Sequence, residues 1–180
     1  LLVLGFPDIY LAGDAAPGNM MYQVGYYPHN IHFFVASASL EGRRADALKA
    51  ADELTAKTPA DMLRDPAMGG MVEHLRLAPI FTKVRFSLWD QVLAEPAPPD
   101  DLHYTTAMWH VSRGLALAAQ NRLREAEAER AIVEAATSDQ ALKMLPISST
   151  NMAGSIVAIG NEVLSGEIAV KRKNASEATR

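Results

Sequence analysis

The sequence contains no cysteine. A chain without cysteine forms neither a disulfide framework nor a thiolate metal site, and this composition suits a reducing compartment. Several short motifs of catalysis and nucleotide binding are also missing: no G-x-G-x-x-G, no Gly-Lys-Ser/Thr loop and no G-x-S-x-G elbow occurs. We therefore expect a cytoplasmic protein without a bound cofactor.

An excess of positive charge and long apolar runs are missing as well. The net charge is −4, which gives no electrostatic reason to expect nucleic acid, and we interpret the basic run 171–173 as a solvated helix end. No apolar run approaches the roughly 20 residues that span a bilayer, and the first residues lack the features of a signal peptide. These absences predict a protein that binds neither nucleic acid nor membrane.

What the chain does have is helical periodicity between Pro- and Gly-rich breaks. Hydrophobic residues make up 49% of the sequence, enough for a packed core, and period-2 alternation is scarce. The segment from Gly25 to Leu54 reads as two amphipathic helices joined at Gly42. The apolar stripes that we expect to face the core are Ile31, Phe34, Val35 and Ala38; Ala47, Ala50, Ala51 and Leu54; Ala107, Val111, Gly114, Leu115 and Ala118; and Ala128, Ala131, Ile132 and Ala135.

Four related heptapeptides mark the turns between paired helices. They are Gly42–Leu48, Ser87–Leu93, Asn121–Glu127 and Lys173–Thr179, each with a turn former or polar residue first and Ala or Val sixth. We expect the sixth residue to lie where the second helix crosses the first, which permits only a small side chain. Ser87 and Asn121 are 34 residues apart, the tetratricopeptide period, whereas the other spacings of 45 and 52 indicate inserted turns.

These turns, together with the stretches YYPHNIHF (26–33), EGRRADALKAADEL (41–54) and VRFSLWDQVL (84–93), resemble an uncharacterised family of bacterial tetratricopeptide-repeat proteins. Ala47, Ala126 and Ala178 match the small residue near the start of the repeat's second helix, and Gly114 matches the small residue inside the first. Val92 in place of Ala, and Ser87 and Lys173 in place of Gly, depart from the pattern. The resemblance implies an all-α fold of antiparallel hairpins stacked as a right-handed solenoid, and a binding role.

We expect one repeat domain over residues 1–180, with hairpins at about 26–58, 68–96, 101–137 and 150–180. Pro79 should interrupt the helix that contains it. The chain begins without Met and stops soon after a new hairpin starts, so we expect it to be part of a longer protein. The helix near 156–170 should then expose an apolar face, which favours self-association through the incomplete last repeat.

The functional hypothesis that follows is a non-enzymatic scaffold that binds a protein or peptide segment. The first helices of a hairpin array line one surface, and we expect Tyr27, Asn30, His103, Tyr104 and His110 to converge there. The alternative is a metal-dependent or hydrolytic enzyme with a site in the groove around His29 and His32, joined by Glu73 or His74. A purely structural role is the other interpretation of these residues: His29 and Asn30 cap a helix while His32 packs at a hairpin boundary.

Overall fold

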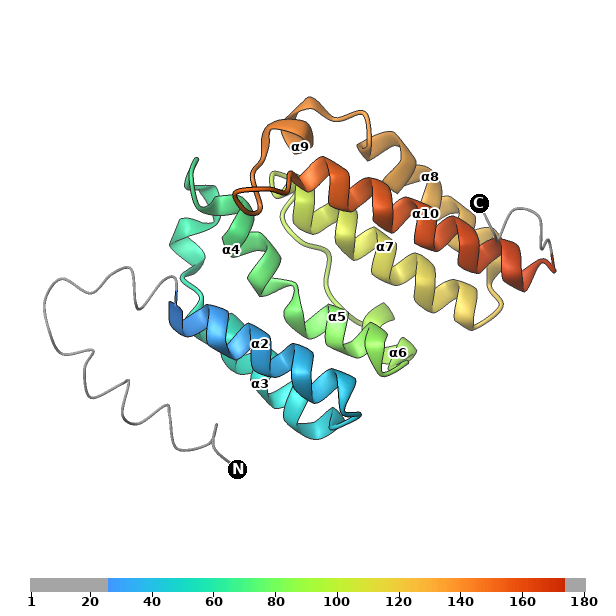
Figure 1. Cartoon of the computed structure of the whole chain (residues 1–180). Helices are drawn as coiled ribbons and strands as arrows, with labels where there is room; N and C mark the ends of the chain where they lie inside the picture. Colours follow the sequence, from blue (N-terminus) through green and yellow to red (C-terminus); the bar gives the residue numbers. More distant parts are fainter. Residues whose placement is uncertain (1–25, 174–180) are drawn as a thin grey trace, which may run out of the picture.

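A computed structural model describes residues 26–173, and this part of the chain is all α-helical (Figure 1). It contains no β-strand within that range, only an isolated antiparallel bridge between Pro146 and Met152. The all-α fold class is therefore confirmed. The elements are α2 (Tyr27–Leu40), α3 (Arg44–Lys57), the 3₁₀ helix η2 (Ala60–Arg64), α4 (Gly69–Arg76), α5 (Ala78–Arg85), α6 (Trp89–Leu93), α7 (His103–Ala119), α8 (Leu123–Ala136), α9 (Gln140–Met144) and α10 (Ala153–Lys171).

The first residue of each heptapeptide adopts a left-handed backbone conformation. The φ angles are 74° at Gly42, 56° at Ser87, 60° at Asn121 and 60° at Lys173, and no other described residue has a positive φ. After the first three, the next amide donates to a carbonyl five residues earlier: Arg43 N to Ala38 O at 2.8 Å, Leu88 N to Lys83 O at 2.9 Å and Arg122 N to Leu117 O at 2.9 Å. This is the Schellman ending of a helix, which satisfies its last carbonyls and reverses the chain.

The sixth residue of each described heptapeptide is completely buried. Ala47, Val92 and Ala126 each have 0% exposure, and each is the fourth residue of its helix, α3, α6 and α8 respectively. The fourth counterpart, Ala178, lies outside the described residues. At the three turns where it is observed, the predicted small or β-branched residue thus sits at a close contact between helices.

Pro79 interrupts the second hairpin as the sequence predicts. α4 ends at Arg76, and α5 begins at Ala78 with the proline in its first turn, where a missing amide hydrogen costs no helical hydrogen bond. The predicted hairpin at about 68–96 is therefore α4 and α5 against the short α6. Of the fourth hairpin, only α10 lies within the described residues.

One predicted stripe is wrong. Ala128, Ala131, Ile132 and Ala135 lie on the outside of α8, whose buried residues are Ala126 and Val133. Between these two lies Glu129, a half-buried carboxylate bonded to α7. On α8 a charged residue therefore faces inward and the alanines beside it face outward, the opposite of what the apolar pattern in the sequence predicts.

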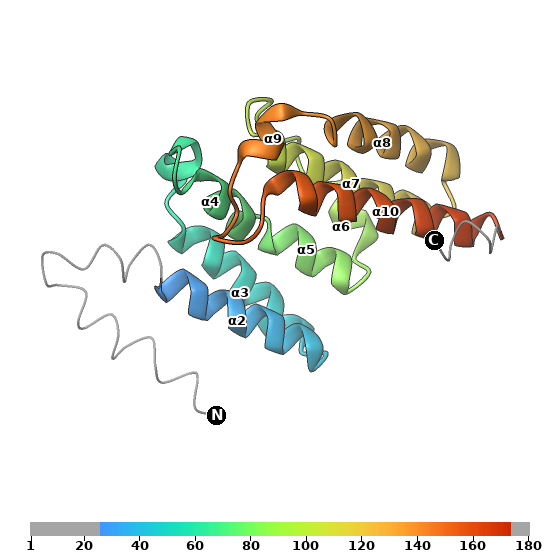
Figure 2. The ribbon, with the colours of Figure 1, turned by 45° about the horizontal axis from the view of Figure 1, so that its top comes forward.

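Each hairpin packs on the next along the chain (Figures 1 and 2). α2 pairs with α3, α5 packs on both, α7 contacts α5 and α6 and pairs with α8, and α10 packs on α7 and α8. Glycines permit the closest contact: a Cβ built on Gly114 would lie 2.5 Å from Leu164 Cδ2, and one built on Gly160 would lie 3.0 Å from Val111 Cγ2. At each of these two glycines, the backbone of one helix lies directly against a side chain of the other.

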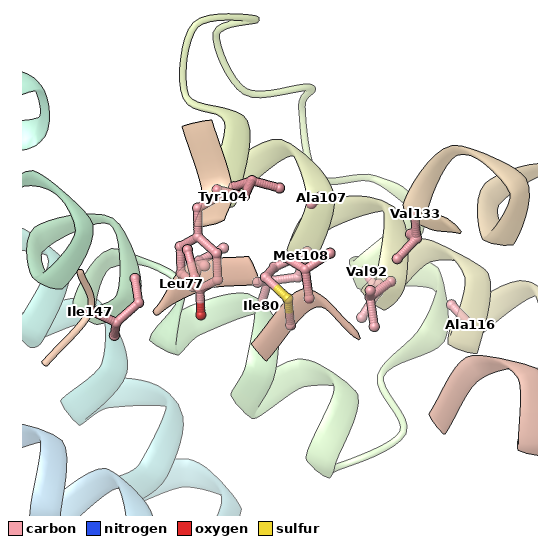
Figure 3. Packing of buried hydrophobic residues seen from close by; sticks show 13 residues of the cluster. Leu77, Ile80, Val92, Tyr104, Ala107, Met108, Ala116, Val133 and Ile147 are labelled. Atoms are coloured by element: carbon pink, nitrogen blue, oxygen red, sulfur yellow. The ribbon is translucent and has the colours of Figure 1, made fainter. Parts of the chain in front are cut away.

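The largest apolar cluster lies where α5, α6 and α7 meet. Figure 3 shows Leu77, Ile80, Tyr104 and Met108 lying against one another, and Val92 and Val133 continue the cluster toward α8. Smaller clusters join α2 and α3 to α4 and α5, and α7 and α8 to α10. The core is thus divided among three apolar clusters, the largest of which reaches from α5 to α10.

α10 is long and apolar enough to cross a bilayer by length and composition alone, with a mean hydropathy of 1.2. The expectation that the chain holds no such segment is corrected on this point. However, 44% of this window is buried inside the protein, against α7, α8 and α9. The same composition is found in core helices of globular proteins.

Candidate functional site

Two histidines and a tyrosine link three helices in the centre of the molecule. Nδ1 of His74 on α4 lies 2.8 Å from the hydroxyl of Tyr104 on α7, and the His74 ring meets His32 of α2 edge to face at 5.7 Å between centroids. Tyr104 has 0% exposure, and burial together with the nearby charge of Glu73 raises its pKa. At neutral pH this phenol is a neutral hydrogen-bonding group that fixes the His74 ring.

Burial lowers the pKa of both histidines in this cluster. For His32 the charge of His29 acts in the same direction, and for His74 the charge of His32 does. Two neighbouring rings that both disfavour protonation are neutral imidazoles at neutral pH. Each then offers one N–H donor and one lone pair, the chemistry that recognises amide groups.

Glu73, next to His74 in sequence, points the other way and caps α7. Its Oε2 accepts hydrogen bonds from both the amide and the hydroxyl of Thr105, each at 2.8 Å. The residue before α7, Leu102, provides no cap of its own, so Glu73 supplies from another helix the acceptor that the first turn requires. Burial raises the pKa of Glu73 more than the bonds from Thr105 lower it.

A pocket of about 290 Å³ lies beside this cap, between η2, the start of α7 and α9. Arg64 forms a two-pronged ion pair with Asp101 at its edge, with N–O distances of 2.6 and 3.0 Å. His103 also lines it and places Nδ1 2.6 Å from Asp139 Oδ2, which lowers the pKa of the Asp139 carboxyl. These pairs hold α7 to η2 and to α9.

A third polar group connects α7 with its hairpin partner α8. His110 Nδ1 donates to Glu129 Oε2 at 2.5 Å, and Arg113 Nε donates to Glu129 Oε1 at 3.0 Å. Burial alone would raise the pKa of Glu129, but these two bonds outweigh it and the pKa is lowered. The guanidinium of Arg113 lies over the Trp109 ring, 4.6 Å from its centroid, which completes a packed ionic contact.

The five residues expected on one binding surface do not come together. Tyr27 donates to Glu53 of its own partner helix at 3.1 Å, His110 faces α8, and Tyr104 is in the core. The predicted orientation is therefore wrong for these three. Asn30 and His103 are exposed, on α2 and at the start of α7 respectively.

The surroundings of His29 and His32 also differ from those of a metal centre. His29 is exposed and packs edge to face on Phe33 at 4.6 Å, while His32 turns toward His74. Across residues 26–173, no group of three His, Cys, Asp or Glu side chains lies close enough to hold a metal ion. Nor does Asn30 or His29 cap α2, whose start has no side-chain cap.

The sequence reasoning missed Glu129 and Arg113, and it did not assign Glu73 its role as a cap. Glu129 lies off the predicted stripe of Ala128, Ala131, Ile132 and Ala135, so no local pattern marks it as facing inward. The bond from Thr105 to Glu73 joins residues 32 apart, and no local pattern indicates it. Comparison of the chain with protein families, with curated proteins and with solved structures finds no significant match.

Proposed function

We propose that this chain is a non-enzymatic scaffold of the tetratricopeptide-repeat type, a right-handed solenoid that binds an extended protein or peptide segment. The observation that supports it is the shared turn: four left-handed turn residues, each opening a matched heptapeptide, with a completely buried sixth residue wherever that position is described. Stacked hairpins of this kind present long, continuous surfaces suited to extended ligands.

The binding surface that we propose is formed by the polar side of α2 and its neighbour on α4. Asn30 and His32 make no side-chain hydrogen bond to any described residue, and His74 uses only Nδ1. An amide and two neutral imidazoles with open donors and acceptors can bond the backbone of a bound segment.

This surface revises the predicted set of residues. Asn30 stays in it, His32 and His74 replace Tyr104 and His110, and Tyr27 supports the helix from the α3 side through Glu53. A half-buried pair of histidines and an amide fit recognition of peptide groups better than hydrolysis, since they bring no nucleophile and no third metal ligand within residues 26–173.

The test is selection of binding peptides from a displayed random library on the purified chain, followed by titration calorimetry with one selected peptide. We expect an Asn30→Ala, His32→Ala double variant to bind at least about tenfold more weakly, since each lost bond to a peptide costs about 1 kcal/mol. Asp52→Ala, an exposed residue on α3, is the matched control and should bind as the wild type does. Equal affinity of the double variant, or no peptide selected over repeated rounds, would overturn the proposed surface.

A further inference from the structure

The outer side of α10 carries an apolar stripe that faces solvent. Ile159, Val163 and Val170 are 64%, 50% and 58% exposed, and their spacing places them on one face of the helix. Gly166 lies within the same stripe. The predicted exposure of an apolar face on this helix is therefore confirmed.

Counting back from the turn residues shows which α7 positions correspond to this stripe on α10. Counted back from their turn residues, Lys173 and Asn121, these three residues occupy the positions of Ala107, Val111 and Ala118 on α7. Those α7 residues are only 2%, 4% and 1% exposed, and Val111 lies in direct contact with α10 at Gly160. The outer stripe of α10 thus repeats the surface onto which a following helix packs.

At the opposite end of the molecule, α2 exposes the position that on later helices packs against the preceding hairpin. Phe33 lies nine positions before its turn residue Gly42, and it is 60% exposed. Its counterparts on later first helices are Ala78, Ser112 and Leu164, which are 3%, 1% and 0% exposed. Ala78 and Leu164 belong to the apolar clusters with the preceding hairpin.

The contact between these two positions is already present once inside the chain. Leu164 fills the space above Gly114, where a Cβ would lie 2.5 Å from its Cδ2. Gly166 is the counterpart of Gly114, since each lies seven positions before its turn residue. By this register, a side chain in the Phe33 position meets a glycine on α10, as Leu164 meets Gly114 on α7.

We propose that copies of this chain associate head to tail, with α2 of one copy packed on α10 of the next as α10 packs on α7. Phe33 then lies over Gly166, flanked by Val163 and Val170. On the same helix, His29 packs edge to face on the Phe33 ring, with 4.6 Å between the ring centroids. Because the two surfaces differ, the contact is heterologous and extends to further copies instead of closing as a symmetric pair.

Sedimentation velocity over a range of concentrations tests this arrangement with two complementary variants. We call the α2 surface around Phe33 the head and the α10 surface around Val163 the tail. Phe33→Lys disrupts the head and leaves the tail intact, whereas Val163→Lys disrupts the tail and leaves the head intact. The wild type should grow beyond dimers as concentration rises, and each variant alone should remain monomeric. An equimolar mixture of the two should form a one-to-one dimer that grows no further, because one intact head then meets one intact tail.

Both side chains are at least half exposed, so circular dichroism should show folded variants with melting temperatures near that of the wild type. Ile132→Lys on the outside of α8, where Ile132 is 48% exposed and belongs to neither surface, is the control and should associate like the wild type. A wild type that stays monomeric at every concentration would overturn the proposal. So would a mixture that does not dimerise, or association that only Val163→Lys prevents, which would indicate symmetric pairing of two α10 helices.

Discussion

Replacing Ala126 by leucine tests the shared register of the turns. The Ala126 methyl group has 0% exposure and belongs to one apolar cluster with Leu117 of α7 and with Leu164 and Ile168 of α10, where three helices meet. A leucine introduces a branched group into a junction without space for it. Overpacking of this kind costs about 1–3 kcal/mol, and Ala47→Leu in the first hairpin should behave in the same way.

Urea denaturation with tryptophan fluorescence or circular dichroism measures this effect directly. We expect a lower midpoint at an unchanged slope, and a melting temperature reduced by roughly 2–4 °C for each kcal/mol in a protein of this size. Ala128→Leu and Ala56→Leu place the same substitution on the exposed sides of α8 and α3 and should stay within about 0.5 kcal/mol of the wild type. If Ala126→Leu and Ala47→Leu unfold at the wild-type midpoint, or if the exposed controls lose as much stability, the turn register is wrong.

Four other substitutions test contacts at single residues. Gly70→Ala should lower the free energy of unfolding by about 1–3 kcal/mol in urea, because the new Cβ would lie 2.3 Å from the backbone oxygen of Pro146. Gly154→Ala, whose nearest neighbour lies at 3.4 Å, should instead raise it by up to about 1 kcal/mol through helix propensity. Glu73→Ala should cost about 1–3 kcal/mol and speed amide hydrogen exchange at the start of α7, because the amide and hydroxyl that it accepts lose their partner. Burial and a neighbouring histidine lower the pKa of His74, so unfolding takes up a proton as the pH falls below the ordinary histidine value, and stability is lost there. His74→Gln, which keeps a hydrogen-bonding side chain but does not titrate, should reduce that loss in unfolding curves measured across this pH range.

The sequence predicts local features well because their causes are local. A turn residue with left-handed backbone, a Pro in the first turn of α5 and the Ala stripe of α3 each depend on a few neighbouring residues. Ala47, Ala50, Ala51 and Leu54, the whole predicted stripe of α3, are at most 5% exposed. In such segments the apolar period and the buried face coincide.

Prediction fails where a polar side chain points inward and finds its partner on another helix. Glu129 takes a place on the inner face of α8 because His110 and Arg113 of α7 bond both of its oxygens. The surrounding alanines then lie outside, where a small residue costs nothing. The prediction that Tyr104 lies on a binding surface is wrong for a related reason. Its hydroxyl is hydrogen-bonded to His74, 30 residues away, so the ring can be buried.

The uneven spacing of the heptapeptides has a structural origin. It changes the repeat length along the chain but not the positions of packing residues relative to the turn. Gly42 and Ser87 are 45 residues apart, and the additional chain forms η2 and its flanking loops, after the first hairpin has closed. Asn121 and Lys173 are 52 apart, and α9 with the bridge from Pro146 to Met152 occupies the added length. Both insertions lie between hairpins, so neither changes the distance from a turn residue to the side chains that pack around it. Positions counted from the turn therefore keep their packing role even where the period along the chain is lost, as the completely buried Ala47, Val92 and Ala126 show. In chains of this kind the turn residue, more than the repeat length, fixes which side of each helix meets the next hairpin.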